Sequence, residues 1–79
     1  MDSELALRME LALRALPGNV NSKAQKFGVH RTTLHRWASG VSEPTYEDVK
    51  KLAEMLGIPT SAIYGPTPVL RTLLPRRSR

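Results

Sequence analysis

The chain has 79 residues and a formal net charge of +5, so its length supports one hydrophobic core and hence a single domain plus any tail that cannot pack. It contains no cysteine, which excludes disulfides, thiolate zinc sites and thiol nucleophiles. No apolar run approaches the roughly 18 residues that a membrane span requires, and the acidic start is unlike a secretory signal, so we expect a cytoplasmic protein with no membrane contact.

The first predicted helix begins at Asp2 or Ser3, either of which can cap it, and ends before Pro17 and Gly18. One apolar stripe at helical spacing is expected to face the core: Leu5, Met9, Ala12, Leu13 and Leu16. Two pairs of opposite charge lie four residues apart and indicate a solvated flank: Glu4 with Arg8, and Glu10 with Arg14.

The next two predicted helices are short and closely spaced. Asn19 can cap a helix that ends near Phe27, and Gly28 supplies a left-handed stop. A third helix begins at His30, continues to Ser39 and ends at Gly40. The turn between the two helices is about three residues long.

A fourth and a fifth helix follow a proline-containing loop. Thr45 and Asp48 have the spacing of a capping box, and the helix that they begin ends at Gly57. A short helix over 60–64 comes next, and Gly65-Pro66-Thr-Pro68 is expected to break the pattern. Because no segment alternates with period two, we expect an all-α fold of five helices in residues 1–65, and a basic, apolar tail over 66–79.

The residues between Val20 and Ser39 satisfy the geometry of two helices that cross through a tight turn. Such a crossing needs a small residue where the helices touch, a glycine at the bend and apolar residues around both. The positions that meet these needs are Ala24, Phe27, Gly28, Val29, Leu34 and Trp37. At this position Trp37 is expected to serve packing rather than base stacking.

The segment VNSKAQKFGVHRTTLHRWASG resembles the helix-turn-helix of the lambdoid phage Cro and repressor family, often called the XRE family. The following GVSEPTYEDVKKLAEMLGIPTSAIYG is similar to that family's fourth and fifth helices. The resemblance implies a compact lambda-repressor-like domain that binds palindromic operators in double-stranded DNA as a dimer. Two positions depart from the family pattern: Val20 stands where a phosphate-contacting glutamine is usual, and Lys23 where an apolar residue is common.

If Leu34, Trp37 and Ala38 point inward, the opposite side of the third helix is wholly polar. Four of its residues are expected to contact bases in the major groove: Arg31, Thr32, His35 and Arg36. An arginine can give two hydrogen bonds to a guanine, and a threonine offers both a hydroxyl and a methyl group. We therefore expect this face to read sequence.

Contacts to phosphate position a protein on DNA without reading its sequence. Residues at helix starts and on an acid-free stretch are suited to this role: Asn21, Ser22, Lys23, Lys26, His30 and Ser39. The segment from Asn19 to Gly40 contains four Lys or Arg residues and no Asp or Glu. This distribution indicates a polyanionic partner.

Apolar residues at two places are candidate contacts for a second copy or a partner. They are Leu7 and Leu11, expected to be exposed on the first helix, and Val69, Leu70, Leu73 and Leu74 in the tail. The tail is expected either to be a helical turn or arm, packed on Leu7 and Leu11 or across a dimer interface, or to be disordered. Arg76, Arg77 and Arg79 would then touch phosphates.

The leading functional prediction is a repressor of phage or prophage origin that acts from the nucleoid by occupying its operator. The alternative is an antitoxin or plasmid-maintenance module whose tail binds a partner protein while the same motif represses its own operon. No enzymatic activity is expected, because the sequence lacks a catalytic acid pair, a Ser-His-acid arrangement and a phosphate-binding glycine loop. We expect no cofactor, metal ion or small-molecule ligand.

Overall fold

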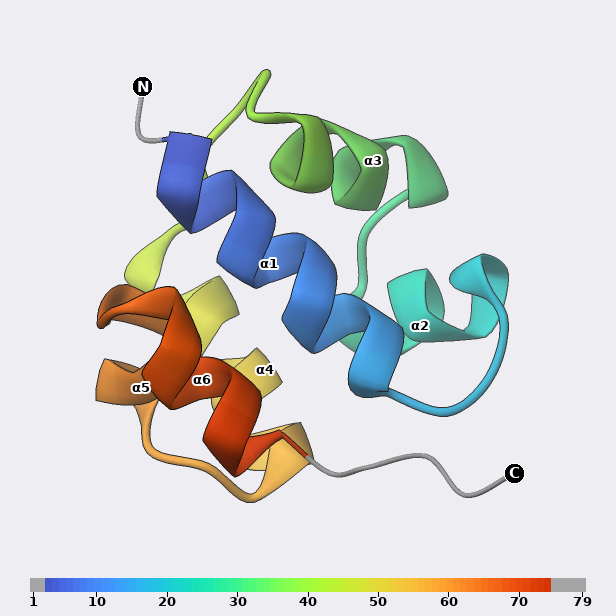
Figure 1. The fold of residues 1–79 in the computed structure, drawn as a ribbon. Coiled ribbons are helices and arrows are strands. Elements are labelled where there is room, and N and C mark those ends of the chain that lie inside the picture. The colour runs from blue at the N-terminus through green and yellow to red at the C-terminus, as the bar shows by residue number, and fades with distance from the viewer. Residues whose placement is uncertain (1–2, 75–79) are drawn as a thin grey trace.

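The computed structural model describes residues 3–74. Within that range the chain forms helices only: α1 (Ser3–Ala15), α2 (Val20–Phe27), α3 (Arg31–Ser39), α4 (Tyr46–Leu56), α5 (Thr60–Tyr64) and α6 (Thr67–Leu73) (Figure 1). The all-α fold is therefore confirmed, but the structure has a sixth helix where the sequence predicted five. No helix among these residues is long and apolar enough to cross a membrane.

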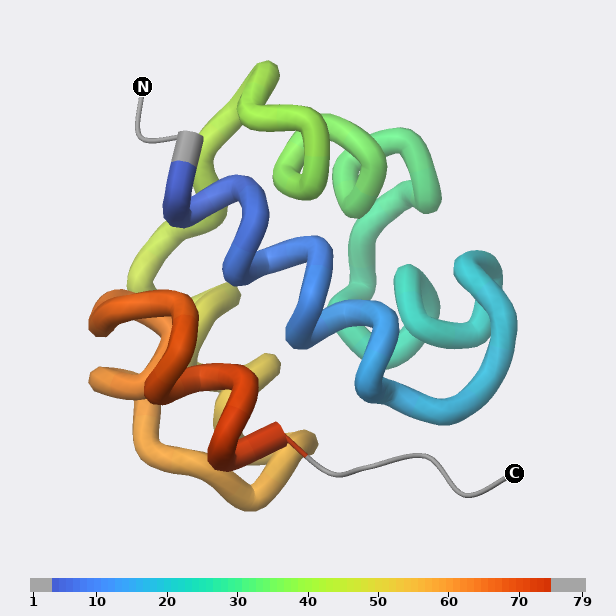
Figure 2. Tube along the Cα trace, viewed as in Figure 1, coloured from blue at the N-terminus to red at the C-terminus, as the bar shows by residue number. Residues whose placement is uncertain are grey.

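Helix α1 lies at the centre of the arrangement. It packs against α3 on one side and against α5 and α6 on the other, and it also contacts α4 (Figure 2). Helix α1 packs against its neighbours through the predicted apolar stripe. All five residues of the stripe are buried, and Met9 and Ala12 are wholly inaccessible to solvent. The same core takes Val49 and Leu52 from α4 and Ile63 from α5. The first helix thus supports α3 directly.

The sequence predicts a break over Gly65-Pro66-Thr-Pro68 and then a tail that is either a helical turn or arm or disordered, and the structure has helix α6 there, beginning within the predicted break. Pro66 is instead the N-cap residue, and Pro68 lies in the first turn of the helix. A proline is well tolerated there, because the backbone N–H that it lacks would have no partner within the helix. The helix buries Leu70 completely in the core of the same chain. The segment is therefore a packed part of the fold up to Leu74.

Arg8 does not lie on a solvated flank as the sequence suggested. Arg8 is only 5% exposed, and its Nε donates a hydrogen bond to the carbonyl oxygen of Ile63 in α5. The Nη1 atom also lies 3.5 Å from Oε1 of Glu4. Arg8 thereby joins the start of α1 to the end of α5, a link between residues far apart in the sequence.

The predicted contact residues outside the helix-turn-helix divide between surface and core. Leu7, Val69 and Leu73 are exposed. Leu11 and Leu74 are only partly exposed and pack against the core, so the expectation that Leu11 would be fully exposed was wrong. Leu70 is a core residue and offers no surface to a partner. Arg76, Arg77 and Arg79 lie outside the described residues.

Candidate nucleic-acid interface

The turn between α2 and α3 has the geometry that the sequence predicted. The side chain of Asn19 caps α2 by accepting a hydrogen bond of 2.9 Å from the backbone N–H of Ser22. Gly28 ends α2 with a φ of +72°, a conformation that costs a glycine nothing and strains other residues. The N–H of Val29 then donates to the carbonyl oxygen of Ala24, and the chain turns directly into α3.

Aromatic packing fixes how the two helices cross. Phe27 and Trp37 are 7% and 4% exposed, so Trp37 is a packing residue, as expected, and not a stacking platform. Leu34 and Ala24 are buried beside them in the same cluster. The inward side of α3 is thus occupied by its apolar residues, and the outward side is left to its polar ones.

His30 both begins α3 and presents a ring nitrogen. Its Nδ1 accepts a hydrogen bond of 3.2 Å from the backbone N–H of Thr32, and it lies 2.8 Å from the hydroxyl oxygen of the same residue. A backbone N–H can only donate, so Nδ1 is the acceptor and the neutral ring carries its proton on Nε2. His30 therefore offers an N–H donor at the start of α3, beside the positive end of the helix dipole.

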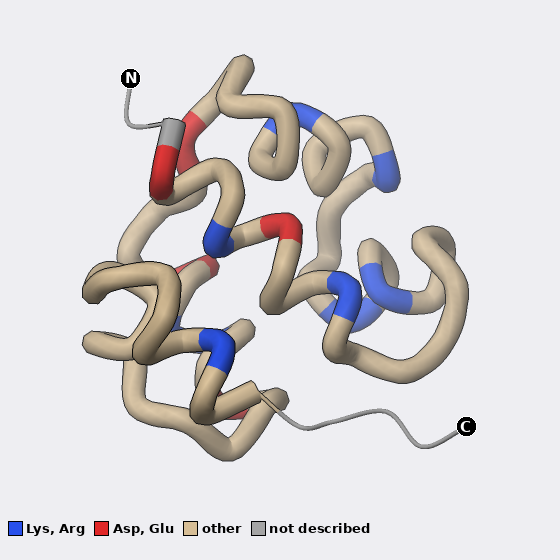
Figure 3. Tube along the Cα trace, in the orientation of Figure 1, with Lys and Arg blue, Asp and Glu red and all other residues tan. Residues whose placement is uncertain are grey.

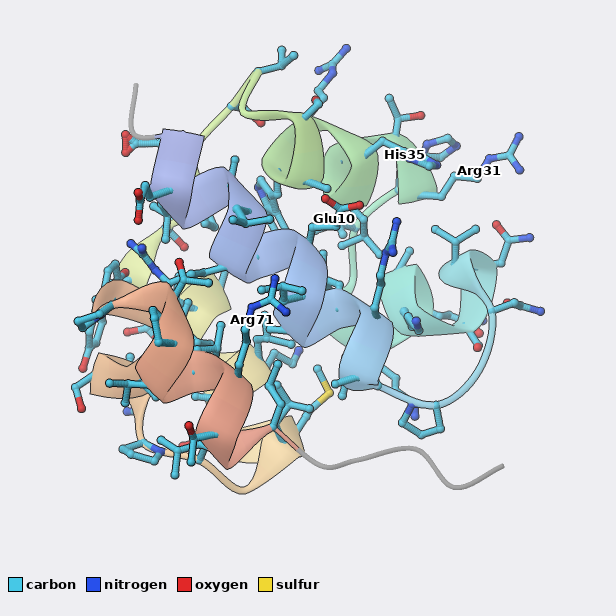
Figure 4. The ribbon with its side chains drawn as sticks, in the orientation of Figure 1. Glu10, Arg31, His35 and Arg71 are labelled. Atoms are coloured by element: carbon cyan, nitrogen blue, oxygen red, sulfur yellow. The ribbon has the colours of Figure 1, made fainter. Side chains whose placement is uncertain are left out.

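The predicted base-reading residues lie on one surface. Arg31, Thr32, His35 and Arg36 are all exposed, on the side of α3 away from Leu34 and Trp37, and so is Ser39, which was predicted to contact phosphate. Arg31 and His35 project from α3 toward the same side of the molecule (Figure 4). Of these, Thr32 has its hydroxyl engaged by His30, and the hydroxyl of Ser39 donates weakly, at 3.4 Å, to the carbonyl oxygen of Arg36.

The predicted phosphate contacts differ in availability. Asn21 and Lys26 are exposed on α2, whereas Ser22 and Lys23 are half-buried. The Nζ of Lys23 donates a hydrogen bond of 2.8 Å to the carbonyl oxygen of Leu13, near the end of α1. This cation stabilises the negative end of the α1 dipole. A phosphate would have to compete with that interaction.

A polar hollow between α2 and the start of α3 includes a residue that the sequence reading missed. Asn21, Gln25, His30 and Arg31 line it, together with Ala24 and Val29. Gln25 follows Asn21 by one helical turn, so the spacing of exposed amides on α2 was a signal for it. Its amide donors, like those of Asn21, suit phosphate oxygens.

The charges of this surface are nearly all positive. Lys and Arg occur along α2 and α3, and no acidic residue does, whereas α1 and α4 carry acids (Figure 3). Glu10 on α1 is the acid that lines a groove shared with α2 and α3. Among residues 3–74 no group of three or more His, Asp or Glu side chains could hold a metal ion.

One comparison with known proteins gives a match. A family model described as Helix-turn-helix matches residues 24–63, about half of the chain, from within α2 into α5. Neither the comparison with curated proteins nor that with solved structures finds a match. The matched range contains the turn at Gly28, the whole of α3 and α4, and most of α5.

Proposed function

The chain belongs to the helix-turn-helix family of Cro and XRE type DNA-binding transcription regulators, and we propose that it is a repressor of phage type that recognises a specific operator. In this proposal α3 enters the major groove of double-stranded DNA and reads base edges, and occupancy of the operator blocks transcription. The protein acts at the nucleoid in the cytoplasm, without a cofactor and without catalytic activity of its own.

The observation that carries the proposal is the exposed side of α3. Arg31 and Arg36 stand on it among polar residues, with no acid on either α2 or α3. Two guanidinium groups on a surface that can enter a groove suit guanine recognition, at about 1–3 kcal/mol of discrimination for each good contact. A helix side that only contacts solvent has no reason to exclude acidic residues. This side of α3 excludes them and belongs to a capped, well-packed motif.

Phosphate anchoring in this proposal falls on the residues whose polar groups face solvent. Lys26 and Asn21 on α2, and the Nε2 donor of His30, are the best placed. Gln25 joins them because it lines the same hollow as Asn21 and His30. Lys23 contributes less, since the carbonyl oxygen of Leu13 already engages its ammonium group.

Binding as a dimer to a palindromic operator is a further part of the proposal. Two copies related by a two-fold axis would read half-sites about one helical turn, or ~34 Å, apart. Of the residues predicted to contact a second copy, Leu7, Val69 and Leu73 are exposed and so remain available for that contact. The alternative function as an antitoxin is not favoured, because Leu70 of the apolar tail lies in the core.

The test is selection of bound duplexes from a random pool at fixed salt, followed by footprinting of the enriched sequence. We expect one consensus with two symmetric half-sites. Enrichment of a single half-site would overturn the dimer but leave sequence-specific binding in place. No enrichment over bulk DNA would overturn the proposed function.

A further inference from the structure

A groove runs between α1 and the helix-turn-helix, next to the surface proposed to read bases. Its rim carries Glu10 and Arg14 from α1, Lys23 from α2 and His35 from α3, and its floor is apolar. Its volume of about 220 Å³ lies below the ~300–1,000 Å³ usual for small-molecule sites. The groove is therefore better suited to a charge interaction along its rim than to a bound ligand.

The two α1 residues on this rim form a close ion pair. The Nη2 of Arg14 donates a hydrogen bond of 2.7 Å to Oε2 of Glu10. The Arg14 side chain is 75% exposed and that of Glu10 is 39% exposed, so the carboxylate is the more sheltered partner. Glu10 points from α1 toward α3, the helix that carries His35 (Figure 4). The acid is thus held in place while the guanidinium remains open to solvent.

This arrangement has a consequence when α3 enters a major groove. His35 shares the rim with the ion pair, so DNA bound in the proposed way would also bring a phosphate backbone toward α1. Each Lys or Arg that reaches a phosphate adds affinity that does not depend on sequence, and a nearby carboxylate opposes it. Glu10 competes with phosphate for the same guanidinium group.

We propose that Arg14 is a phosphate-binding residue and that Glu10 limits its contribution, so that the pair sets how tightly the protein holds DNA of any sequence. The inference rests on the proposed DNA-binding function and adds to it a residue outside the helix-turn-helix. Glu10 acts through Arg14 and is a positioning residue. Its effect matters because a regulator must leave the many competing non-specific sites on a genome in order to find its operator.

The experiment compares the full chain with E10Q, R14Q and the double variant E10Q/R14Q on a duplex of arbitrary sequence over a range of salt. E10Q should bind about three- to tenfold more tightly at low salt, and its plot of log K against log salt should be steeper by about 0.9, the value for one added phosphate contact. When E10Q is added to R14Q, the slope of log K against log salt should stay that of R14Q alone. Circular dichroism melting checks that each variant is folded.

The matched control is E54Q, which removes the same charge from α4, outside the groove. If E10Q and E54Q change affinity and salt slope alike, net charge alone is responsible and the inference is overturned. It is equally overturned if E10Q has no effect in a protein that binds DNA. A parent protein that binds no duplex would overturn the proposed function as well, so the two failures can be told apart.

Discussion

The indole ring of Trp37 meets the phenyl ring of Phe27 edge-on, with the ring centroids 5.7 Å apart and the planes at 81°. Trp37 belongs to α3 and Phe27 is the last residue of α2, so the contact joins the two helices across the turn at Gly28. Edge-to-face pairs of this kind add about 0.5–1.5 kcal/mol to what burial alone provides. The direction in which α3 points therefore depends on this pair.

Replacing Phe27 with leucine should lower the free energy of unfolding by about 1–3 kcal/mol, because the core keeps an apolar residue but loses volume and the edge-to-face contact. Urea denaturation followed by the fluorescence of Trp37, the one tryptophan in the chain, measures the change. The control is Val41→Ala at an apolar residue that is 66% exposed, for which we expect about 0.5 kcal/mol or less. Equal losses in the two variants would contradict the role of the pair.

Replacing Arg8 with lysine should destabilise the protein by about 1–3 kcal/mol, although the charge is kept. Lysine has no Nε–H at the position that serves the carbonyl oxygen of Ile63, and a buried carbonyl without a partner is costly. Arg14→Lys is the matched control on the same helix, since Arg14 is exposed and its pair with Glu10 contributes at most about 0.5 kcal/mol to stability. Similar unfolding curves for both variants would refute a structural role for Arg8.

Three alanine substitutions separate base reading, phosphate binding and helix capping. Arg36→Ala should lose discrimination at particular base pairs of the selected operator, by about 1–3 kcal/mol. Lys26→Ala should weaken binding to all sequences about equally and reduce the salt slope by about 0.9. Lys23→Ala should instead lower the free energy of unfolding by about 0.5–1 kcal/mol, because the Leu13 carbonyl oxygen loses its cation.

Binding titrations on operator and mismatched duplexes, together with urea denaturation, distinguish these outcomes. A uniform loss of affinity in Arg36→Ala would contradict base contact. A salt slope that falls as much in Lys23→Ala as in Lys26→Ala would show that Lys23 binds phosphate in spite of its bond to α1.

Replacing Leu70 with alanine should cost about 2–5 kcal/mol, the usual range for a buried leucine. Leu73 offers a control of the same chemistry on the same helix, because it is 43% exposed whereas Leu70 is fully buried. We expect Leu73→Ala to cost about 1 kcal/mol or less. Denaturation midpoints for the two variants measure the difference, and a small effect at Leu70 would mean that α6 is not part of the folded core.

The pKa of Tyr64 is raised above its usual value of 10.0, chiefly by burial and further by the nearby Tyr46 and Glu43. The rings of Tyr46 and Tyr64 stack with their centroids 6.3 Å apart. A raised pKa means that the unfolded chain releases this proton at lower pH than the folded one. The stability that this contributes is present below about pH 10 and is lost as pH rises further.

Urea denaturation at pH steps across that range measures the alkaline loss of stability in the parent and in Tyr64→Phe. The variant cannot ionise at this position, so its stability should fall less steeply above about pH 10. Parallel declines in the two proteins would show that Tyr64 does not titrate differently in the folded state.

Local chemistry explains why much of the fold could be predicted from the sequence. The cap at Asn19, the capping box of Thr45 and Asp48 and the stop at Gly28 each depend on residues within one turn of each other. The same holds for the division of α3 into a buried apolar side and an exposed polar side, since Leu34 and Trp37 determine which side is buried once the helix is known. These features were correct because neighbours along the chain determine them.

The features that were missed depend on partners far along the chain. Arg8 looked like half of a surface pair because nothing in its neighbourhood announces the carbonyl oxygen of Ile63. Lys23 finds its partner ten residues earlier, on a different helix. The sequence predicts a break at Pro68 because a proline can either end a helix or begin one, and the burial of Leu70 shows that Pro68 helps to begin α6. Roles in DNA contact stay predictions, since they depend on docking.

The separation of the two sides of α3 has an evolutionary consequence. The side chains that hold this helix in place, Leu34 and Trp37, are different from those exposed for recognition. Surface substitutions away from caps and partners usually change stability by no more than about 0.5 kcal/mol. Positions such as Arg31 and Arg36 can therefore diverge between descendants of this protein at little cost to folding, which lets new target sequences arise on an unchanged scaffold.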